Sequence, residues 1–117
     1  MARIGITGTD LVVTLSPLEK VLAFHGDLRV PLSTVKQACP EPHPWRALRG
    51  IRAPGTGFPG LIAYGSYRYN GGQDFALILF GVPVVGIALG PGAPFDRLLI
   101  STRRQDAALA AIAAASV

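Results

Sequence analysis

The chain has 117 residues, of which 50% are hydrophobic and 15% are charged. This length suits one domain with a buried core, and so few charges among so many apolar residues exclude an intrinsically disordered chain. The formal net charge of +4 comes mostly from arginine, and its modest size favours a solvated surface with local ion pairs over a nucleic-acid-binding face. We therefore expect a single domain over residues 1–117.

Cysteine and histidine are too few to build a disulfide framework or a metal site. Cys39 is the only cysteine, which excludes an internal disulfide and a cysteine-based zinc site. His25 and His43 have no further ligands at metal spacing, so we expect neither a metal nor a cofactor. The first residues lack the apolar stretch of a signal peptide, and no apolar run reaches the ~18 to 20 residues of a membrane span. These features predict a cytoplasmic protein without a transmembrane segment.

The first third of the chain predicts a hairpin, a short helix and two short strands. Apolar residues alternate on both sides of Gly8-Thr9-Asp10, which predicts a hairpin over residues 4–15. Ser16-Pro17-Leu18-Glu19 is a capping box with proline at the first helical position, and Gly26 ends the helix that follows. Residues 28–32 and 34–39 are strand candidates, and their brevity and proline content favour an edge position.

Residues 40–60 are expected to be mostly irregular. Three prolines within residues 40–44 break regular structure, and Trp45 to Arg49 form one helical turn at most. The stretch Gly55 to Gly60 formally matches the G-x-G-x-x-G pattern of dinucleotide-binding sites. It opens a strand rather than a helix, however, and Pro59 lacks an amide donor, so we expect these glycines to shape a surface loop.

The second half predicts a meander of antiparallel strands and a closing helix. Strand-like runs cover residues 61–69, 74–80, 84–89 and 97–101, and Asn70-Gly71 between the first two is a hairpin signal. The second and third runs are apolar on both faces. They are therefore either central and covered on both sides or part of a self-association interface that exposes Ile78 or Val84. Thr102 to Gln105 is a capping-box pattern before the helix formers 106–115, whose Leu109 and Ile112 we expect to pack on the sheet.

About seven short strands closed by one helix is the outline of the pleckstrin-homology fold. The stretches 15–21, 25–32 and 48–60 and the pair Asp74-Phe75 resemble small actinobacterial proteins with a bacterial PH-like domain, most specifically in Pro54 to Gly60. The resemblance implies a mainly β, PH-like antiparallel barrel or sandwich of about seven strands, with a short helix near residues 16–24 and a closing C-terminal helix. It carries no settled activity. The first hairpin loop, Thr7 to Asp10, has no basic residue, which argues against phosphoinositide binding there.

The candidate binding residues lie in the middle third. Arg46, Arg49 and Arg52 recur at a spacing of three, and guanidinium groups pair with carboxylate or phosphate and stack on aromatic rings. Trp45 and Phe58 offer apolar contacts beside them. We expect this loop to meet an acidic protein or an anionic surface, and ordinary solvation or ion pairing with Asp27, Glu41 or Asp74 is the alternative.

The aromatic run on residues 64–69 favours packing over nucleic-acid recognition. Strand alternation puts Tyr67 and Tyr69 on one face and Tyr64 and Arg68 on the other, which divides any base-stacking platform, and we expect no sequence-specific nucleic-acid binding. Cys39 is expected to be a buried, unreactive residue.

Together these patterns predict a non-enzymatic binding or self-assembly module that forms a homo-oligomer and binds through the arginine and tryptophan loop. One alternative is peripheral attachment to an anionic membrane through the same loop. Another is a small-molecule-binding enzyme with a pocket around Tyr67, Arg68 and His25, although no activated nucleophile or carboxylate pair is present. We expect no catalytic residue, and the predicted binding residues are Trp45, Arg46, Arg49, Arg52, Thr56, Phe58, Tyr67 and Arg68.

Overall fold

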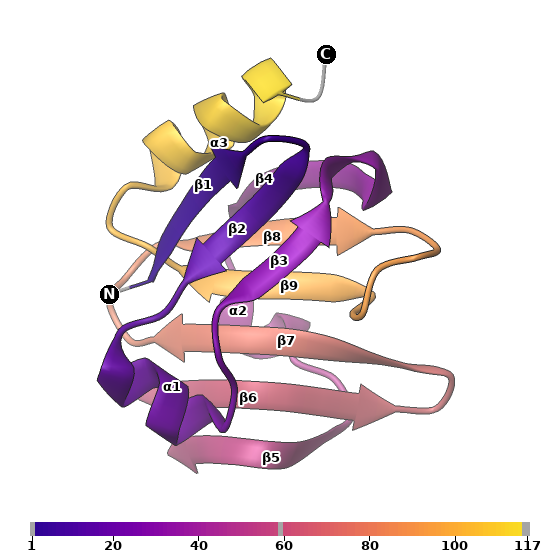
Figure 1. The fold of residues 1–117 in the computed structure, drawn as a ribbon. Helices are drawn as coiled ribbons and strands as arrows, with labels where there is room; N and C mark the ends of the chain where they lie inside the picture. Colours follow the sequence, from indigo (N-terminus) through magenta and orange to yellow (C-terminus); the bar gives the residue numbers. More distant parts are fainter. Residues whose placement is uncertain (1, 59, 116–117) are drawn as a thin grey trace.

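The computed structural model describes residues 2–58 and 60–115, which form nine strands, three α-helices and one 3-10 turn (Figure 1). None of the helices in this part of the chain is long and apolar enough to cross a membrane. The elements in chain order are β1 Arg3–Thr7, β2 Asp10–Thr14, α1 Pro17–Ala23, β3 Leu28–Pro31, the 3-10 turn Leu32–Thr34, β4 Val35–Glu41, α2 Pro44–Ala47, β5 Ile51–Phe58, β6 Ile62–Tyr69, β7 Gly72–Leu79, β8 Val84–Leu89, β9 Arg97–Ser101 and α3 Gln105–Ala115.

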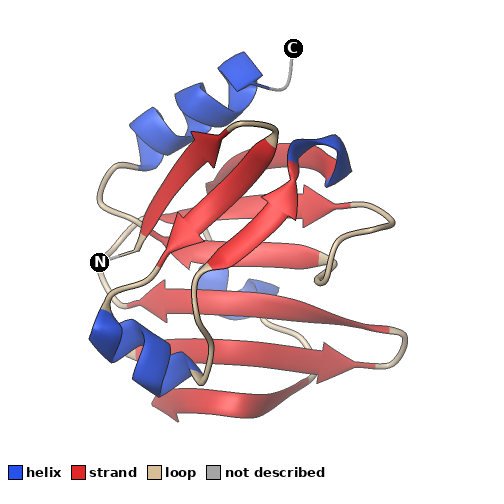
Figure 2. Ribbon diagram, viewed as in Figure 1, coloured by secondary structure: helices blue, strands red, loops and turns tan. Residues whose placement is uncertain are grey.

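The strands form two sheets, and the expectation of a mainly β fold is confirmed. The smaller sheet has the order β1-β2-β3, and the larger has the order β4-β8-β9-β7-β6-β5. Figure 2 shows the smaller sheet lying over one face of the larger one. Of the two expected arrangements, a barrel or a sandwich, the barrel is not formed, because β4 and β5 end the larger sheet as separate edges.

One strand pair contradicts the expectation of antiparallel pairing throughout. Strand β9 runs parallel to β7, with Asp74 opposite Arg97, and antiparallel to β8. Strands β7 and β8 follow each other in the chain but are not neighbours in the sheet, and the space between them holds one more strand. The segment after β8 then brings β9 back into this space, at the centre of the sheet.

Local signals set the helix α1 and the β6–β7 hairpin as predicted. The Ser16 hydroxyl accepts a hydrogen bond from the Glu19 amide at 3.3 Å, and the Glu19 carboxylate accepts one from the Ser16 amide at 2.8 Å, which completes the capping box. The helix ends before Gly26 because Phe24 takes a left-handed conformation with φ of 52°. Asn70 and Gly71 connect β6 to β7 directly, as expected.

The glycine-rich stretch of the middle third is a strand, which corrects the expectation of a loop. β5 pairs with β6 along the free edge of the larger sheet, and its register shifts between Arg52 and Gly55. An edge strand can accommodate a proline at such a shift because the amide that proline lacks would face away from the sheet. The same reason explains why β4, the other edge strand, continues through Pro40.

Two apolar clusters cover the two faces of the larger sheet. The main core lies between the sheets and includes Phe75, Leu77, Ile87, Leu98 and Ile100. The second cluster lies on the opposite face, where Trp45, Ala47 and Leu48 from the α2 region cover buried side chains of β6 to β9. These buried residues are Ala63, Tyr67, Ala76, Ile78, Val84 and Leu99.

The strands that are apolar on both faces are therefore central strands. Ile78 and Val84 are 0% and 1% exposed, so neither offers an outward-facing interface. The closing helix α3 packs through Ile112, which is buried, and Leu109, which is half-buried, as expected. It begins at Gln105, later than the Thr102 capping pattern predicts, and the Gln105 side chain donates to the Val84 carbonyl at 2.8 Å.

The turn before β5 generates a first prediction about stability. Gly50 has a φ of 83°, and a Cβ there would overlap the carbonyl oxygen of Arg68. Gly50→Ala should therefore lower the free energy of unfolding by about 1–3 kcal/mol. The control is Gly5→Ala, because no atom lies within 4 Å of the added methyl group there. Urea unfolding measures both, and equal stability of the two variants would contradict the strain at Gly50.

Candidate functional site

The carboxylate of Asp74 on β7 is buried, and it forms ion pairs with two arginines. Its side chain is 2% exposed. Arg49, from the segment after α2, donates from Nε to Oδ2 at 2.8 Å and from Nη2 to Oδ1 at 3.1 Å. Arg97 on β9 donates from Nη2 to Oδ2 at 2.9 Å, and a second Arg97 hydrogen bond reaches the carbonyl of Ala47. The network thus ties the α2 region to the middle of the larger sheet.

Tyr69 extends this network to Asp96. Its hydroxyl lies 3.0 Å from Asp74 Oδ1 and 2.8 Å from Asp96 Oδ2, and it accepts from Arg49 Nη2 at 2.7 Å. The Arg49 guanidinium also lies 4.2 Å from the centre of the Tyr69 ring. The pKa of Tyr69 is raised, mainly by burial of its hydroxyl and then by its hydrogen bonds to Asp96 and Asp74. The hydrogen bond to Asp74 raises the pKa of Arg49, so this arginine is fixed as a charged structural partner.

The predicted arginine and tryptophan loop is therefore not one open surface. Arg49 is bound to Asp74, and Trp45 is half-buried in the second apolar cluster. Arg46 is exposed at the end of α2, whereas the Arg52 side chain lies against Gly57 of its own strand. The three arginines are all exposed but have three different environments, and Arg49 is already paired with Asp74.

Thr56 and Phe58 lie on the opposite face of β5. Thr56 donates from its hydroxyl to the carbonyl of Leu22 at 2.7 Å, which fastens β5 to α1. Phe58 follows two residues later on the same face and is 58% exposed. Neither residue shares a surface with Trp45, which covers the other face of the sheet.

The alternative of a pocket around Tyr67, Arg68 and His25 is not assembled. Tyr67 is buried in the second cluster, whereas the His25 ring lies 5.1 Å from the Phe75 ring in the main core, on the other face of the sheet. Arg68 is exposed and follows Tyr67 onto the opposite face. Cys39 is half-buried and unpaired rather than fully buried. In residues 2–58 and 60–115, no three His, Cys, Asp or Glu residues lie close enough to hold a metal ion.

A basic cleft that the sequence analysis missed lies between the start of β1 and the start of α3. Its volume is about 520 Å³. Arg3 comes from β1, and Arg103 and Arg104 come from the turn that precedes α3. The cleft is lined by Ala2, Arg3, Ile4, Thr102, Arg103, Arg104, Ala107 and Ala108.

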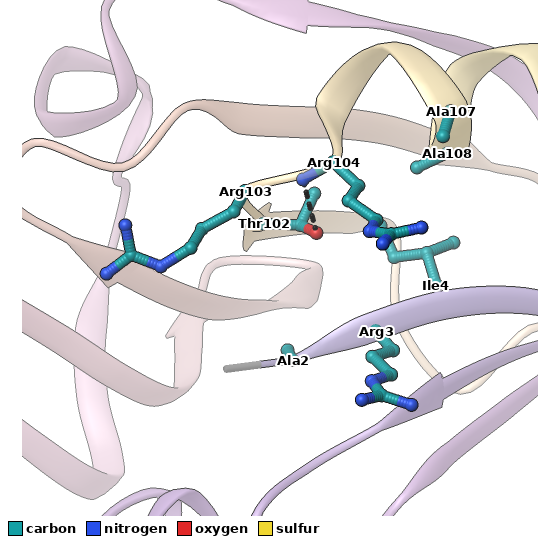
Figure 3. A pocket seen from close by; sticks show the side chains of 8 residues that line it. All are labelled: Ala2, Arg3, Ile4, Thr102, Arg103, Arg104, Ala107 and Ala108. Atoms are coloured by element: carbon teal, nitrogen blue, oxygen red, sulfur yellow. Dashed lines mark hydrogen bonds between the residues drawn. The ribbon is translucent and has the colours of Figure 1, made fainter.

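The three arginines line the cleft but extend in different directions. In Figure 3 the Arg104 side chain lies near Ile4, whereas Arg3 leaves β1 on the side away from Ile4 and Arg103 extends to the left of the view. All three are exposed, and within residues 2–58 and 60–115 none forms an ion pair with an acidic side chain. Thr102 Oγ1, which accepts from the Arg104 amide at 3.4 Å, holds the turn that carries Arg103 and Arg104.

Only a weak sequence signal points to this cleft. Adjacent arginines directly before a helix place two cations at one end of that helix. Arg3 is a hundred positions away in the sequence, and only the packing of α3 beside β1 brings it near. The basic cleft, defined by Arg3, Arg103 and Arg104, is thus the described surface at which cations gather without an acidic partner.

The Asp74 network generates a second prediction. Asp74→Asn keeps the shape of the side chain but removes the charge that pairs with Arg97 and Arg49, whose side chains are 24% and 48% exposed, so it should destabilise the fold by about 1–3 kcal/mol. Asp10→Asn is the control, because Asp10 pairs at 2.8 Å with the exposed Arg29 and should cost about 0–1 kcal/mol. Thermal and urea unfolding measure both. Equal effects would mean that the Asp74 network is no more stabilising than a surface ion pair.

Comparison with known proteins gives no match, so the function of the basic cleft and of the Asp74 network is inferred from their chemistry. No protein-family model, curated protein or solved structure matches the chain.

Proposed function

We propose that this protein is a non-enzymatic binding module that holds an anionic group, such as a phosphate or a carboxylate, in the basic cleft. The observation that carries the proposal is that Arg3, Arg103 and Arg104 line one cleft without an acidic partner among the described residues. A guanidinium group forms two parallel hydrogen bonds with a phosphate or carboxylate, so two of them on one cleft suit such a ligand.

The distribution of charge supports this cleft over the predicted arginine and tryptophan loop. Asp74 pairs with both Arg49 and Arg97, and Asp10 and Asp27 pair with Arg29 and Lys20. Asp106 is the nearest acidic residue in sequence to the cleft arginines and is exposed in the first turn of α3. Three arginines at the cleft against this one aspartate leave a net positive surface.

The broader parts of the interpretation are proposals as well. A PH-like relationship is supported by two packed, mainly antiparallel sheets and a helix after the last strand. A cytoplasmic location is supported by the single cysteine of the sequence. An acidic protein segment and a phosphate-bearing molecule are both partners that the chemistry of the cleft would accept.

A phosphate titration tests the proposal. Inorganic phosphate added to the ¹⁵N-labelled protein at low ionic strength should shift the amide signals of residues 3–4 and 102–108. Arg3→Ala combined with Arg104→Ala should weaken phosphate binding by about tenfold or more, since each lost charged hydrogen bond contributes about 1 kcal/mol or more. Added sodium chloride should weaken binding to the unaltered protein because it screens the exposed charges.

The matched control is Arg46→Ala combined with Arg52→Ala, which removes the same charge from the predicted loop. Binding by this control should stay close to that of the unaltered protein. If the control loses phosphate binding and the Arg3 and Arg104 variant keeps it, the anion site lies in the loop instead of the cleft.

Self-association is a second candidate function, favoured by one observation. Leu18, Val21 and Phe24 are 66%, 66% and 65% exposed and follow one another at a spacing of three along α1. If two copies pair through this stripe, Val21→Lys should halve the mass measured by sedimentation equilibrium. A monomeric unaltered protein at high micromolar concentration would contradict this candidate.

A further inference from the structure

Exposed apolar side chains gather at the end of the larger sheet where β5 and β7 finish. Phe58 is the last residue of β5, Leu61 precedes β6, and Phe80 follows β7. Their exposed fractions are 58%, 56% and 67%. Backbone hydrogen bonds of 2.9 Å join the Leu61 amide to the Phe58 carbonyl and the Phe80 amide to the Leu61 carbonyl. We call these three residues the apolar rim.

The apolar rim and the basic cleft lie at the same end of the molecule. The turn after Phe80 leads to Pro83, whose carbonyl accepts a hydrogen bond of 2.9 Å from the Thr102 amide. Pro83 and Arg103 line one hollow that adjoins the basic cleft. Figure 1 accordingly shows the arrowheads of β5 and β7, the N-terminal end of the described chain and the turn before α3 at the same end of the molecule, on the left of the view.

We propose that this end of the molecule docks on an anionic lipid surface, with the apolar rim entering the interface and the arginines of the basic cleft meeting lipid phosphates. This inference rests on the proposed function and adds the source of the anionic group. Turn residues with exposed phenylalanine suit shallow insertion at the boundary between headgroups and acyl chains, and neighbouring arginines suit anionic headgroups.

The charge of this surface argues against the other occupants. A second copy docked symmetrically through the same end would bring its arginines toward those of the first copy, and like charges oppose such a pairing. An acidic peptide would pair with the arginines, but the protruding, separately exposed phenylalanines offer it no matching apolar groove. A lipid surface provides anionic groups and an apolar layer together.

Vesicle sedimentation tests the inference with the full chain. The protein should pellet with phosphatidylcholine vesicles that contain about a quarter phosphatidylglycerol, and much less with phosphatidylcholine alone. Phe58→Ser combined with Phe80→Ser should lower the partition coefficient about tenfold, because two apolar contacts with the interface are lost. The same variant should bind inorganic phosphate as the unaltered protein does.

Ile51→Ser is the matched control for the apolar rim. Ile51 is 75% exposed and lies on the same strand as Phe58, at the opposite end, so this change should leave vesicle binding unaltered. Arg3→Ala combined with Arg104→Ala should lower both phosphate binding and vesicle binding. All of the substituted side chains are exposed, so we expect each variant to fold. Amide signals that stay unchanged away from the substitutions verify this.

Four outcomes would overturn the inference. If the unaltered protein binds phosphate at the cleft but does not bind vesicles, the proposed function stands and the lipid surface is excluded. If the unaltered protein binds neither phosphate nor vesicles, the proposed function is excluded as well. Equal binding to neutral and anionic vesicles would exclude the arginines from the interaction. A dimer in solution that Phe58→Ser and Phe80→Ser convert to a monomer would assign the apolar rim to a second copy of the chain.

Discussion

The buried carboxylate of Asp74 is the constraint on which the surface chemistry of this protein depends. A carboxylate that is 2% exposed must be matched by opposite charge and hydrogen bonds, and Arg49, Arg97 and Tyr69 provide them. The segment that follows α2 is thereby held on the sheet, and Trp45 and Leu48 complete the second apolar cluster. One buried acid thus gives two arginines a structural role and determines which arginines remain open to a partner.

The fold brings exposed arginines and exposed apolar residues to one end of the molecule. Arg3 and the arginines before α3 come together because the closing helix packs next to β1, and the turns at the nearby sheet end expose Phe58, Leu61 and Phe80. Cationic and apolar side chains therefore lie at one end of the molecule. This arrangement suits the proposed binding of an anionic group.

Local signals were predictable from the sequence, and long-range pairings were not. The capping box at Ser16, the Asn70-Gly71 hairpin and the closing helix each depend on residues a few positions apart, and each forms as expected. The parallel pairing of β9 with β7 depends on how a chain segment returns to the sheet, which hydrophobic alternation does not encode. The spacing of Arg46, Arg49 and Arg52 suggested a shared surface, but the partner of Arg49 lies 25 positions along the chain. The basic cleft was missed for the same reason, since Arg3 and Arg104 meet only through tertiary packing.

We propose that the arginines of the basic cleft are free to bind an anion, whereas those held by Asp74 are not. The most direct measurement is the NMR spectrum of the arginine side-chain Nε–Hε groups during addition of inorganic phosphate. We expect the Arg3 and Arg104 signals to shift together along one binding curve, while the Arg49 and Arg97 signals stay in place. Shifts confined to Arg46 and Arg52, or a shift of Arg49 with the cleft signals unmoved, would contradict it.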